Sequence, residues 1–230
     1  MVETSSIGGP SATRISERSE WNRALRSLVR SRAAVVGVIV LLAVMVVAVA
    51  AAWIAPHNPN EQVLERRLLP PAWMEGGSRA HPLGTDHLGR DILSRTIYGS
   101  RVSLAVGFSA VLISGLLGVG VGLIAGYYGR AYEAAIMRLV DIQLAFPFIL
   151  LALAIIGVLG PGLRNVILVL GVAGWMVYAR VVRGQVLSVR EREFVEAARA
   201  IGASDFRIIR RHVLPNTLAP VIIVATFAVA

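Results

Sequence analysis

The sequence contains no lysine and no cysteine, and each absence excludes a class of chemistry. All 23 basic residues are arginine, so the chain lacks the lysine with which a P-loop ATPase contacts the phosphates of its nucleotide. It therefore cannot supply that chemistry itself. Without cysteine the chain forms neither a disulfide nor a thiolate metal site, and its redox compartment cannot be inferred from cysteine usage.

Apolar residues dominate what is present. Hydrophobic residues make up 56% of the chain, which is typical of a membrane protein and not of a soluble domain of this length. In addition to the four predicted spans named in the next sentence, an apolar run at residues 218–230 has only 13 residues. This is too few to cross a bilayer, so we expect the sequence to stop inside a helix. Because a hydrocarbon core of about 30 Å needs about 20 apolar residues, the segments predicted to span the bilayer are residues 33–55, 102–128, 136–159 and 165–186.

The net charge of +9 could indicate a nucleic-acid partner, but the arginines are distributed as in a membrane protein, and we expect no nucleic acid. They cluster before the first predicted span and after the fourth, whereas the loop of residues 56–101 has nearly balanced charge. Both arginine-rich regions, and with them the N-terminus, are predicted to be cytoplasmic, and the loop extracytoplasmic. A cleaved signal peptide is the rival interpretation, but the 32-residue leader and the 23-residue apolar run are too long for one.

The first 32 residues are predicted to form a cytoplasmic tail that ends in a helix. The tail begins with a segment rich in Ser, Gly and Arg that has no apolar periodicity, which is typical of disorder. Between residues 20 and 32, Trp21, Leu25 and Leu28 recur at helical spacing among arginines. This spacing indicates either an amphipathic helix on the inner leaflet or a helix continuous with the first span.

The last third of the outer loop contains four side chains of the types that bind metals. They have only loose spacing. In the competing structural interpretation, the aspartates cap turns or pair with nearby arginines, and the histidines bond to the backbone. We favour this second interpretation and predict no metal site among the four, which are His81, Asp86, His87 and Asp91.

Gly118, Gly122 and Gly126 recur at every fourth residue of the second predicted span. Small residues at this spacing leave a flat helix face against which another helix can pack closely in lipid. The face can serve tight packing inside a bundle or a sliding contact for a moving helix, and the sequence does not separate the two.

Polar residues and a proline in the third and fourth spans are candidates for a translocation path or gate, because polar groups are costly in a membrane unless they face protein or water. Arg138 and Asp141 are three positions apart and can neutralise each other on one helical face. A proline should bend the third span. Interface anchoring and simple shaping of the bundle are the alternatives. The candidate path residues are Asp141, Gln143, Pro147, Asn165 and Trp175.

Residues 187–216 are predicted to form two short amphipathic helices joined by a sharp turn. We expect Gly202 to end the first helix in the left-handed conformation, Ser204 to cap the second, and Pro215 to end it. Apolar residues recur at helical spacing in both helices, as Phe194, Ala198 and Ile201 in the first and as Phe206, Ile209 and Val213 in the second.

This arginine-rich loop resembles the cytoplasmic coupling loop of ATP-binding cassette (ABC) importer permeases. The family pattern is E-A-A, three residues, G, nine residues and then a hydrophobe-x-L-P, carried here by Glu196, Ala197, Ala198, Gly202, Leu214 and Pro215. The position usually filled by isoleucine is His212. In the outer loop, the block HPLGTDHLGRDILSRTIYGSRVSL resembles the signature of the dipeptide, oligopeptide and nickel branch of these permeases.

The resemblance implies an all-α, polytopic transmembrane helix bundle like that of type I ABC importer permeases, with a cytoplasmic helix-turn-helix coupling loop. It implies that residues beyond position 230 complete the fifth helix and add a sixth. The residues expected to couple to the ATPase are Glu196, Ala197, Ala198, Gly202, Ala203, Phe206, Leu214 and Pro215. Among these, we expect Glu196 to make the polar contact that fixes docking.

The resemblance also implies a subunit of a bacterial cell-membrane importer, not an enzyme. A second permease, two separate ATPase subunits and an extracytoplasmic binding protein are the implied partners, together with the lipid bilayer. The implied cargo is short peptides, with nickel or a peptide-like metabolite as alternatives. No cofactor is expected on this chain, because ATP and Mg²⁺ belong to the ATPase subunits. The alternative mechanism is an ion-coupled secondary transporter that uses Arg138 and Asp141.

Overall fold

The structure, a computed structural model, describes residues 31–229. This part of the chain is all-α, as predicted, and its sole strand-type pairing is an isolated bridge between Thr85 and Asp91. The predicted N-terminal tail and amphipathic helix lie outside the described residues, except for their last two positions. In chain order the elements are α2 (Arg32–Val49), α3 (Ala51–Ile54), the 3₁₀ turn η1 (Leu64–Arg66), α4 (Ile92–Tyr128), α5 (Arg130–Ala145), α6 (Phe148–Leu159), α7 (Leu163–Arg190), α8 (Glu193–Ala200), α9 (Asp205–Ile208), the π-helical turn η2 (Ile209–Val213) and α10 (Leu214–Val229).

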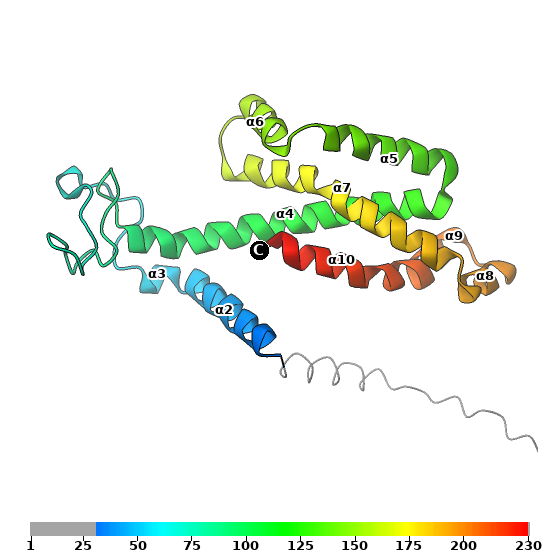
Figure 1. The fold of residues 1–230 in the computed structure, drawn as a ribbon, viewed down its shortest axis with the longest axis horizontal. Coiled ribbons are helices and arrows are strands. Elements are labelled where there is room, and N and C mark those ends of the chain that lie inside the picture. Colours follow the sequence, from blue (N-terminus) through cyan, green and yellow to red (C-terminus); the bar gives the residue numbers. More distant parts are fainter. Residues whose placement is uncertain (1–30, 230) are drawn as a thin grey trace, which may run out of the picture.

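The longest helix, α4, is the axis of the fold, with the outer loop at its beginning and the α8–α9 region near its end (Figure 1). Its 37 residues extend about 55 Å at 1.5 Å per residue, more than the ~30 Å of a hydrocarbon core. The second span, predicted from residue 102, therefore continues a helix that begins at Ile92. That earlier start is fixed by Asp91, whose carboxylate caps the helix by accepting a hydrogen bond from the Ser94 N–H at 2.7 Å.

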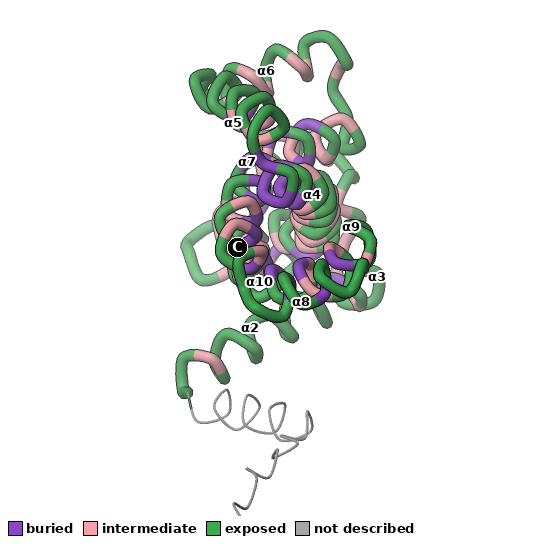
Figure 2. Tube along the Cα trace, turned by 90° about the vertical axis from the view of Figure 1, so that its right-hand side faces the viewer, coloured by how far each residue is buried: buried purple, intermediate pink, exposed green. Residues whose placement is uncertain are grey.

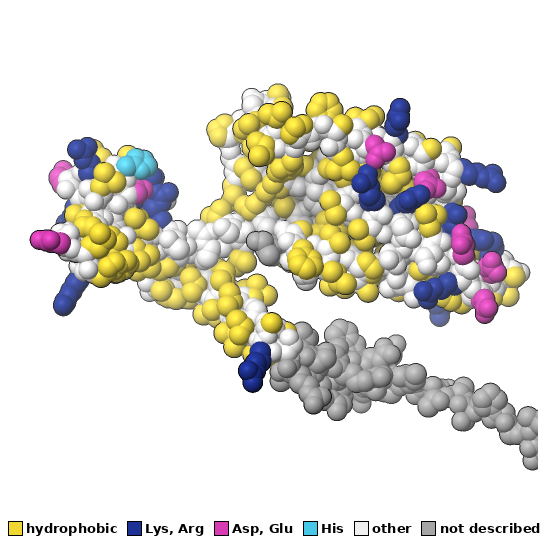
Figure 3. Space-filling model, viewed as in Figure 1, with side chains coloured by type: hydrophobic (Ala, Val, Ile, Leu, Met, Phe, Trp, Pro, Cys, Tyr) yellow, Lys and Arg dark blue, Asp and Glu magenta, His cyan; other side chains and the backbone are white. Residues whose placement is uncertain are grey.

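Apolar side chains cover the middle of the molecule, and charged side chains gather at its two ends (Figure 3). Many of the apolar side chains are exposed; Val36 and Leu42 on α2, for example, are more than half exposed. Such faces suit contact with lipid or with another membrane helix. Among the described residues, the helices long and apolar enough to cross a membrane are Arg32–Val49, Ile92–Tyr128, Leu163–Arg190 and Asp205–Ala228, and the bent pair α5 and α6 makes five if it is one span.

Helix α4 packs along α7, and buried residues concentrate where the two meet (Figure 2). A Cβ atom added at Gly118, Gly122 or Gly126 would lie 2.4–2.7 Å from atoms of α7. Such distances are too short for two non-bonded heavy atoms, whose contacts are optimal at about 3.5–4.0 Å. The glycine stripe is thus a tight packing contact between these two helices.

The third predicted span, residues 136–159, consists of two helices that meet at an angle of 89°. Pro147 stands at the N-cap position of α6 with φ −56°, where its fixed φ is tolerated and its missing N–H removes no bond from a helix interior. The bend expected at Pro147 is present, but as a break between α5 and α6.

Candidate coupling loop and path residues

Helix α8 ends in a tight turn centred on Gly202. The Gly202 N–H donates to the Arg199 carbonyl at 3.0 Å and the Ala203 N–H to the Ala198 carbonyl at 3.1 Å, which is the hydrogen-bond pattern of a Schellman motif. Gly202 has φ +79°, and a Cβ atom there would meet nothing within 4 Å. The backbone conformation alone therefore favours glycine, and the left-handed helix end predicted at Gly202 is confirmed.

After this turn the chain forms one continuous helix, α9–η2–α10, in place of the short second helix that was expected. Ser204 occupies the predicted N-cap position, but its side chain makes no capping hydrogen bond. The expectation that Pro215 ends the helix is wrong, since Pro215 lies in the first turn of α10. The reason is the π-helical turn just before it, where the Leu214 N–H reaches back to the Ile209 carbonyl. The wider turn makes room for the proline ring, which would clash with the preceding turn of a regular α-helix.

The α8–α9 region buries one face against the bundle. Val195 and Ala198 of α8, Ile208 of α9 and the following Val213 of η2 belong to the same buried cluster as residues of α4 and α7 such as Leu123, Val186 and Val189. The apolar stripes read from the sequence divide between the two faces, because Ala198 and Val213 are buried whereas Ile201 is 85% and Phe206 71% exposed. Ile201 is the C-cap residue of α8, at the turn that follows the helix, and its side chain does not belong to the buried cluster.

The residues predicted to couple to the ATPase divide between the two faces. Ala198 is buried and belongs to the cluster shared with α4 and α7. Ala203 and Leu214 are half-buried. The exposed members are Glu196, Ala197, Gly202, Phe206 and Pro215. With Ile201 they form what we call the outer face of the coupling loop.

One hydrogen bond ties this region to the end of α4, and a second joins the ends of α4 and α7. The Tyr127 hydroxyl of α4 donates to the Asp205 carboxylate of α9 at 2.7 Å. The Arg190 guanidinium of α7 donates to the Gly126 carbonyl of α4 at 2.9 Å. Sequence reasoning missed Tyr127, because its partner lies 78 positions further along the chain and no local pattern joins the two.

Asp141, a predicted path residue on α5, is paired across helices. Its carboxylate accepts a hydrogen bond from the Arg180 guanidinium of α7 at 2.8 Å, and both side chains are more than half exposed. The expected pairing of Asp141 with Arg138 is absent from the described structure, and Arg138 is exposed. The inter-helix partner replaces the intra-helix one because α7 runs beside α5 and presents a long, flexible cation.

Two further polar contacts join the same helices. The Trp175 indole N–H donates to the Gln143 side-chain oxygen at 2.9 Å, which brings two predicted path residues together. The Arg183 guanidinium pairs with Glu133, a contact that sequence reasoning did not anticipate. α5 is therefore fastened to α7 by polar groups along its length.

The remaining path candidates lie elsewhere. The Asn165 side-chain amide donates to the carbonyls of Leu159 at 2.9 Å and Gly160 at 3.0 Å, and so closes the turn between α6 and α7. Pro147 is exposed at the break between α5 and α6. Of the five predicted path residues, Gln143 and Trp175 are thus joined by a hydrogen bond, whereas Asp141 and Asn165 each bond to other partners.

In the outer loop, Asp86 acts as the structural interpretation expects. Its carboxylate accepts hydrogen bonds from the backbone N–H groups of Leu88 at 2.8 Å and Arg90 at 3.1 Å, and it pairs with the guanidinium groups of Arg90 and Arg95. Burial raises the pKa of Asp86, but the bonds from Arg90 and Leu88 outweigh it and hold the pKa well below its ordinary value. Asp86 is therefore a fixed anion that organises the loop.

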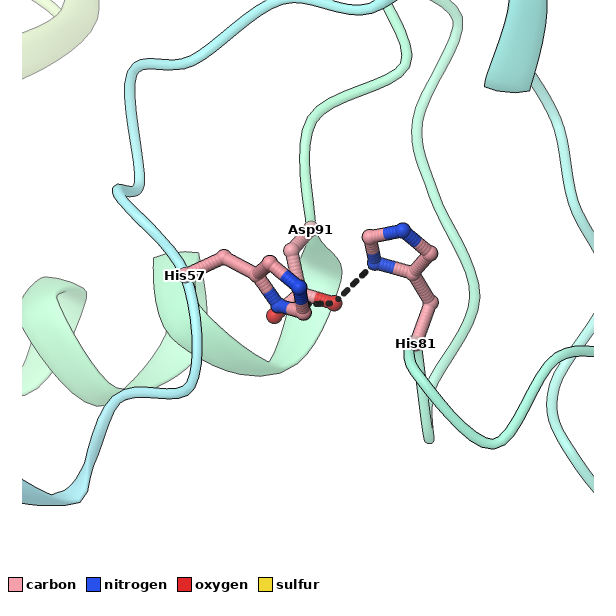
Figure 4. A group of neighbouring side chains, drawn as sticks. All are labelled: His57, His81 and Asp91. Carbon is pink, nitrogen blue, oxygen red and sulfur yellow. Dashed lines mark hydrogen bonds and ion pairs between the residues drawn. The ribbon is translucent and has the colours of Figure 1, made fainter.

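The four potential metal ligands considered in the sequence do not assemble. His87 is exposed, and Asp86 is occupied by the arginines. His81 and Asp91 do meet, and the third member of their group is His57 (Figure 4). Sequence reasoning missed His57 because it lies in the proline-rich beginning of the loop, far from the other two along the chain.

Two regions of the chain match known protein families. Residues 118–230 match the family described as binding-protein-dependent transport system inner membrane component. Residues 19–71 match the N-terminal TM domain of oligopeptide transport permease C. Both matched regions include helices described above.

Curated relatives agree with these matches. A dipeptide transport system permease protein of Haemophilus influenzae is 42% identical over 201 residues, which cover 87% of this chain and 68% of the relative. A di/tripeptide transport system permease protein of Pseudomonas aeruginosa is 42% identical, over 88% of this chain and 67% of the relative. For a dipeptide transport system permease protein of Escherichia coli K12 the identity is 47%, over 86% and 66%. The chain therefore spans about two thirds of the length of these relatives.

Proposed function

Because the chain belongs to the binding-protein-dependent inner membrane components, the permease subunits of ABC importers, we propose that it contributes a translocation path for short peptides and receives its driving force through the coupling loop. It is a multi-pass membrane protein and a transporter subunit, not an enzyme. The peptide cargo is supported by the relatives, which are named dipeptide or di/tripeptide permeases.

The two-faced structure of the coupling loop is the observation that carries the proposal. Its outer face exposes Ile201 and Phe206 beside Glu196, a mixture of apolar anchors and one carboxylate that suits a groove on another protein. Its inner face shares one buried cluster with α4 and α7. Force applied to the outer face would therefore reach the membrane helices through packed side chains.

In the proposed assembly the outer face lies in the cytoplasm and docks on an ATPase subunit that holds ATP and Mg²⁺. Arginines concentrate in this part of the chain, at the end of the molecule opposite the outer loop (Figure 3), which supports a cytoplasmic position by the positive-inside rule. The N-terminus would then be cytoplasmic too. The outer loop would face an extracytoplasmic binding protein, and the exposed apolar helix faces would contact lipid and a second permease, which completes a heterodimer.

The test replaces one exposed apolar side chain at each end of the molecule. Ile201→Ala removes a side chain that is 85% exposed on the outer face, and the matched control Leu64→Ala removes one that is 62% exposed in the outer loop. Loss of an interface anchor costs about 1–2 kcal/mol, or roughly a tenfold loss of affinity. We expect Ile201→Ala to reduce copurification of the ATPase subunits and solute-stimulated ATP hydrolysis, and Leu64→Ala to leave copurification unchanged.

Glu196→Gln extends the test to the predicted polar contact, at an exposed position where the fold does not depend on the charge. Unchanged ATPase stimulation in both Ile201→Ala and Glu196→Gln would contradict the coupling proposal. The cargo is tested separately by uptake of a labelled dipeptide into cells, with Ni²⁺ and a peptide-like metabolite as competitors. Uptake that continues without the ATPase subunits and collapses with the ion gradient would instead support a secondary transporter.

A further inference from the structure

Three potential metal ligands from separate parts of the outer loop meet in one place (Figure 4). His57 follows the end of α3, His81 lies in the middle of the loop, and Asp91 caps the beginning of α4. Each offers one ligand atom, and these atoms all lie within 4.8 Å of one another. Because the three residues are far apart in sequence, only the folded loop assembles them.

The distances are close to those that a small ion requires. The His81 Nδ1 atom lies 3.0 Å, and the His57 Nδ1 atom 4.0 Å, from the same Asp91 oxygen, Oδ1. In a tetrahedral site with metal–ligand bonds of about 2.0–2.2 Å, neighbouring ligand atoms are separated by roughly 3.3–3.6 Å. The observed separations bracket this value, so small side-chain movements would bring all three atoms to bonding distance.

His57 has a ligand atom with nothing to bond in the described structure. Its Nδ1 is buried and has no hydrogen-bond partner among residues 31–229, an arrangement that is uncommon in folded proteins because a buried polar atom without a partner is costly. The His57 and His81 rings stack with centroids 4.6 Å apart, which keeps the two imidazoles next to each other at the carboxylate. This unsatisfied atom is the observation, beyond the clustering itself, that points to a ligand.

The surroundings hold the three side chains in place. The second oxygen of Asp91 accepts a hydrogen bond from the backbone N–H of Ser94 at 2.7 Å, and the Ser94 hydroxyl accepts one from the backbone N–H of His57 at 3.0 Å. Such supporting bonds orient ligands in known metal sites.

We propose that His57, His81 and Asp91 bind one divalent transition-metal ion of the Zn²⁺ or Ni²⁺ class, which takes imidazole and carboxylate ligands. The ion takes the place of the hydrogen between His81 Nδ1 and Asp91, and His81 stays a neutral imidazole because its single ring proton moves to Nε2. The His57 side chain is 31% exposed, which gives the ion a route in and leaves a coordination position for water. The bound ion would clamp the segment after α3 to the beginning of α4.

The test uses the full chain, purified with its copurifying subunits through an affinity tag that contains no histidine, and Zn²⁺ as the probe. His57→Gln removes a ligand whose Nδ1 makes no hydrogen bond, so the fold should be retained. His87→Gln is the matched control, because His87 is an exposed histidine of the same loop outside the group. Thermal unfolding and Zn²⁺ stoichiometry are measured for the unmodified chain and both variants.

We expect Zn²⁺ at about 100 times its Kd to raise the Tm of the unmodified chain and of His87→Gln by about 5–10 °C. His57→Gln should bind Zn²⁺ at least tenfold more weakly and contain about one fewer Zn²⁺ per chain. The proposal is overturned if millimolar Zn²⁺ leaves the Tm of the unmodified chain unchanged, or if His57→Gln binds Zn²⁺ as tightly as His87→Gln. Neither result depends on the solute or on ATP hydrolysis, so the coupling proposal can stand or fail separately.

Discussion

Substitution of a single glycine measures the close contact between α4 and α7. A Cβ atom at Gly118 would lie 2.4 Å from the Trp175 carbonyl oxygen and 2.5 Å from the Tyr178 Cβ. Because one of these neighbouring atoms belongs to the backbone of α7, the clash cannot be relieved by a change of side-chain rotamer. In the variant Gly118→Ala, the two helices must separate locally by roughly 1 Å to restore ordinary contact distances.

Gly120→Ala is the matched control, because a Cβ atom at Gly120 meets nothing within 4 Å. Replacing glycine by alanine inside a helix is favourable by about 1 kcal/mol in both variants, and this gain cancels in the comparison. What remains is the cost of overpacking at Gly118, about 1–3 kcal/mol. For a chain of this size the difference corresponds to roughly 2–12 °C in Tm.

The assay is thermal unfolding of the purified full chain in detergent, followed by circular dichroism. Dyes that react with cysteine are unsuitable because the chain has none. Gly120→Ala should melt at or slightly above the temperature of the unmodified chain, and Gly118→Ala clearly below Gly120→Ala. If the two variants melt together, the close contact between α4 and α7 does not exist as described.

Three further predictions concern polar groups. Tyr127→Phe removes the hydrogen bond to the Asp205 carboxylate and should destabilise the attachment of the coupling loop by about 1.5–3 kcal/mol, which is measured as faster proteolysis at the coupling loop. Tyr128→Phe, at a half-exposed neighbouring residue, is the control. Equal proteolysis rates in the two variants would contradict the contact. Since the folded pKa of Asp86 is lowered, its contribution to stability should be complete above the ordinary aspartate pKa of about 3.9 and should fall as the pH drops below it. The stability difference between the unmodified chain and Asp86→Asn should therefore shrink on acidification, and a constant difference would refute this. Asp141→Asn should change stability by less than about 1 kcal/mol, because the ion pair it breaks is exposed, and a larger loss of Tm would show that the pair is structural.

How much could be predicted depended on whether the determining interactions were local. The turn at Gly202 could be predicted because a positive φ is a property of one residue and its immediate hydrogen bonds. The buried face of α8 could not, because a helix of eight residues gives too short a pattern to fix its orientation. The orientation follows from tertiary packing, in which Val195 joins the buried cluster shared with α4 and α7 and Ile201 is exposed.

Hydropathy likewise located apolar segments but not their geometry. It could not show that the third segment breaks at Pro147 with an angle of 89°, or that a π-helical turn lets the chain continue through Pro215. The partners of Asp141 and Gln143 lie on another helix, at separations of 39 and 32 positions. Such pairings follow from how helices pack, which no single segment encodes.

The two ends of α4 connect the outer loop to the coupling loop. At its beginning, Asp91 fixes the helix to the loop through His81 and the Ser94 N–H. At its end, Tyr127 holds Asp205 of α9, and between them the glycine stripe packs α4 tightly against α7. Under the proposed function, a displacement of the coupling loop must therefore move α4 and α7 together. Because α4 is about 55 Å long, a rotation of 5° about one end displaces the other by roughly 5 Å. A small movement in the cytoplasm would thus be felt at the outer loop, on the opposite side of the membrane.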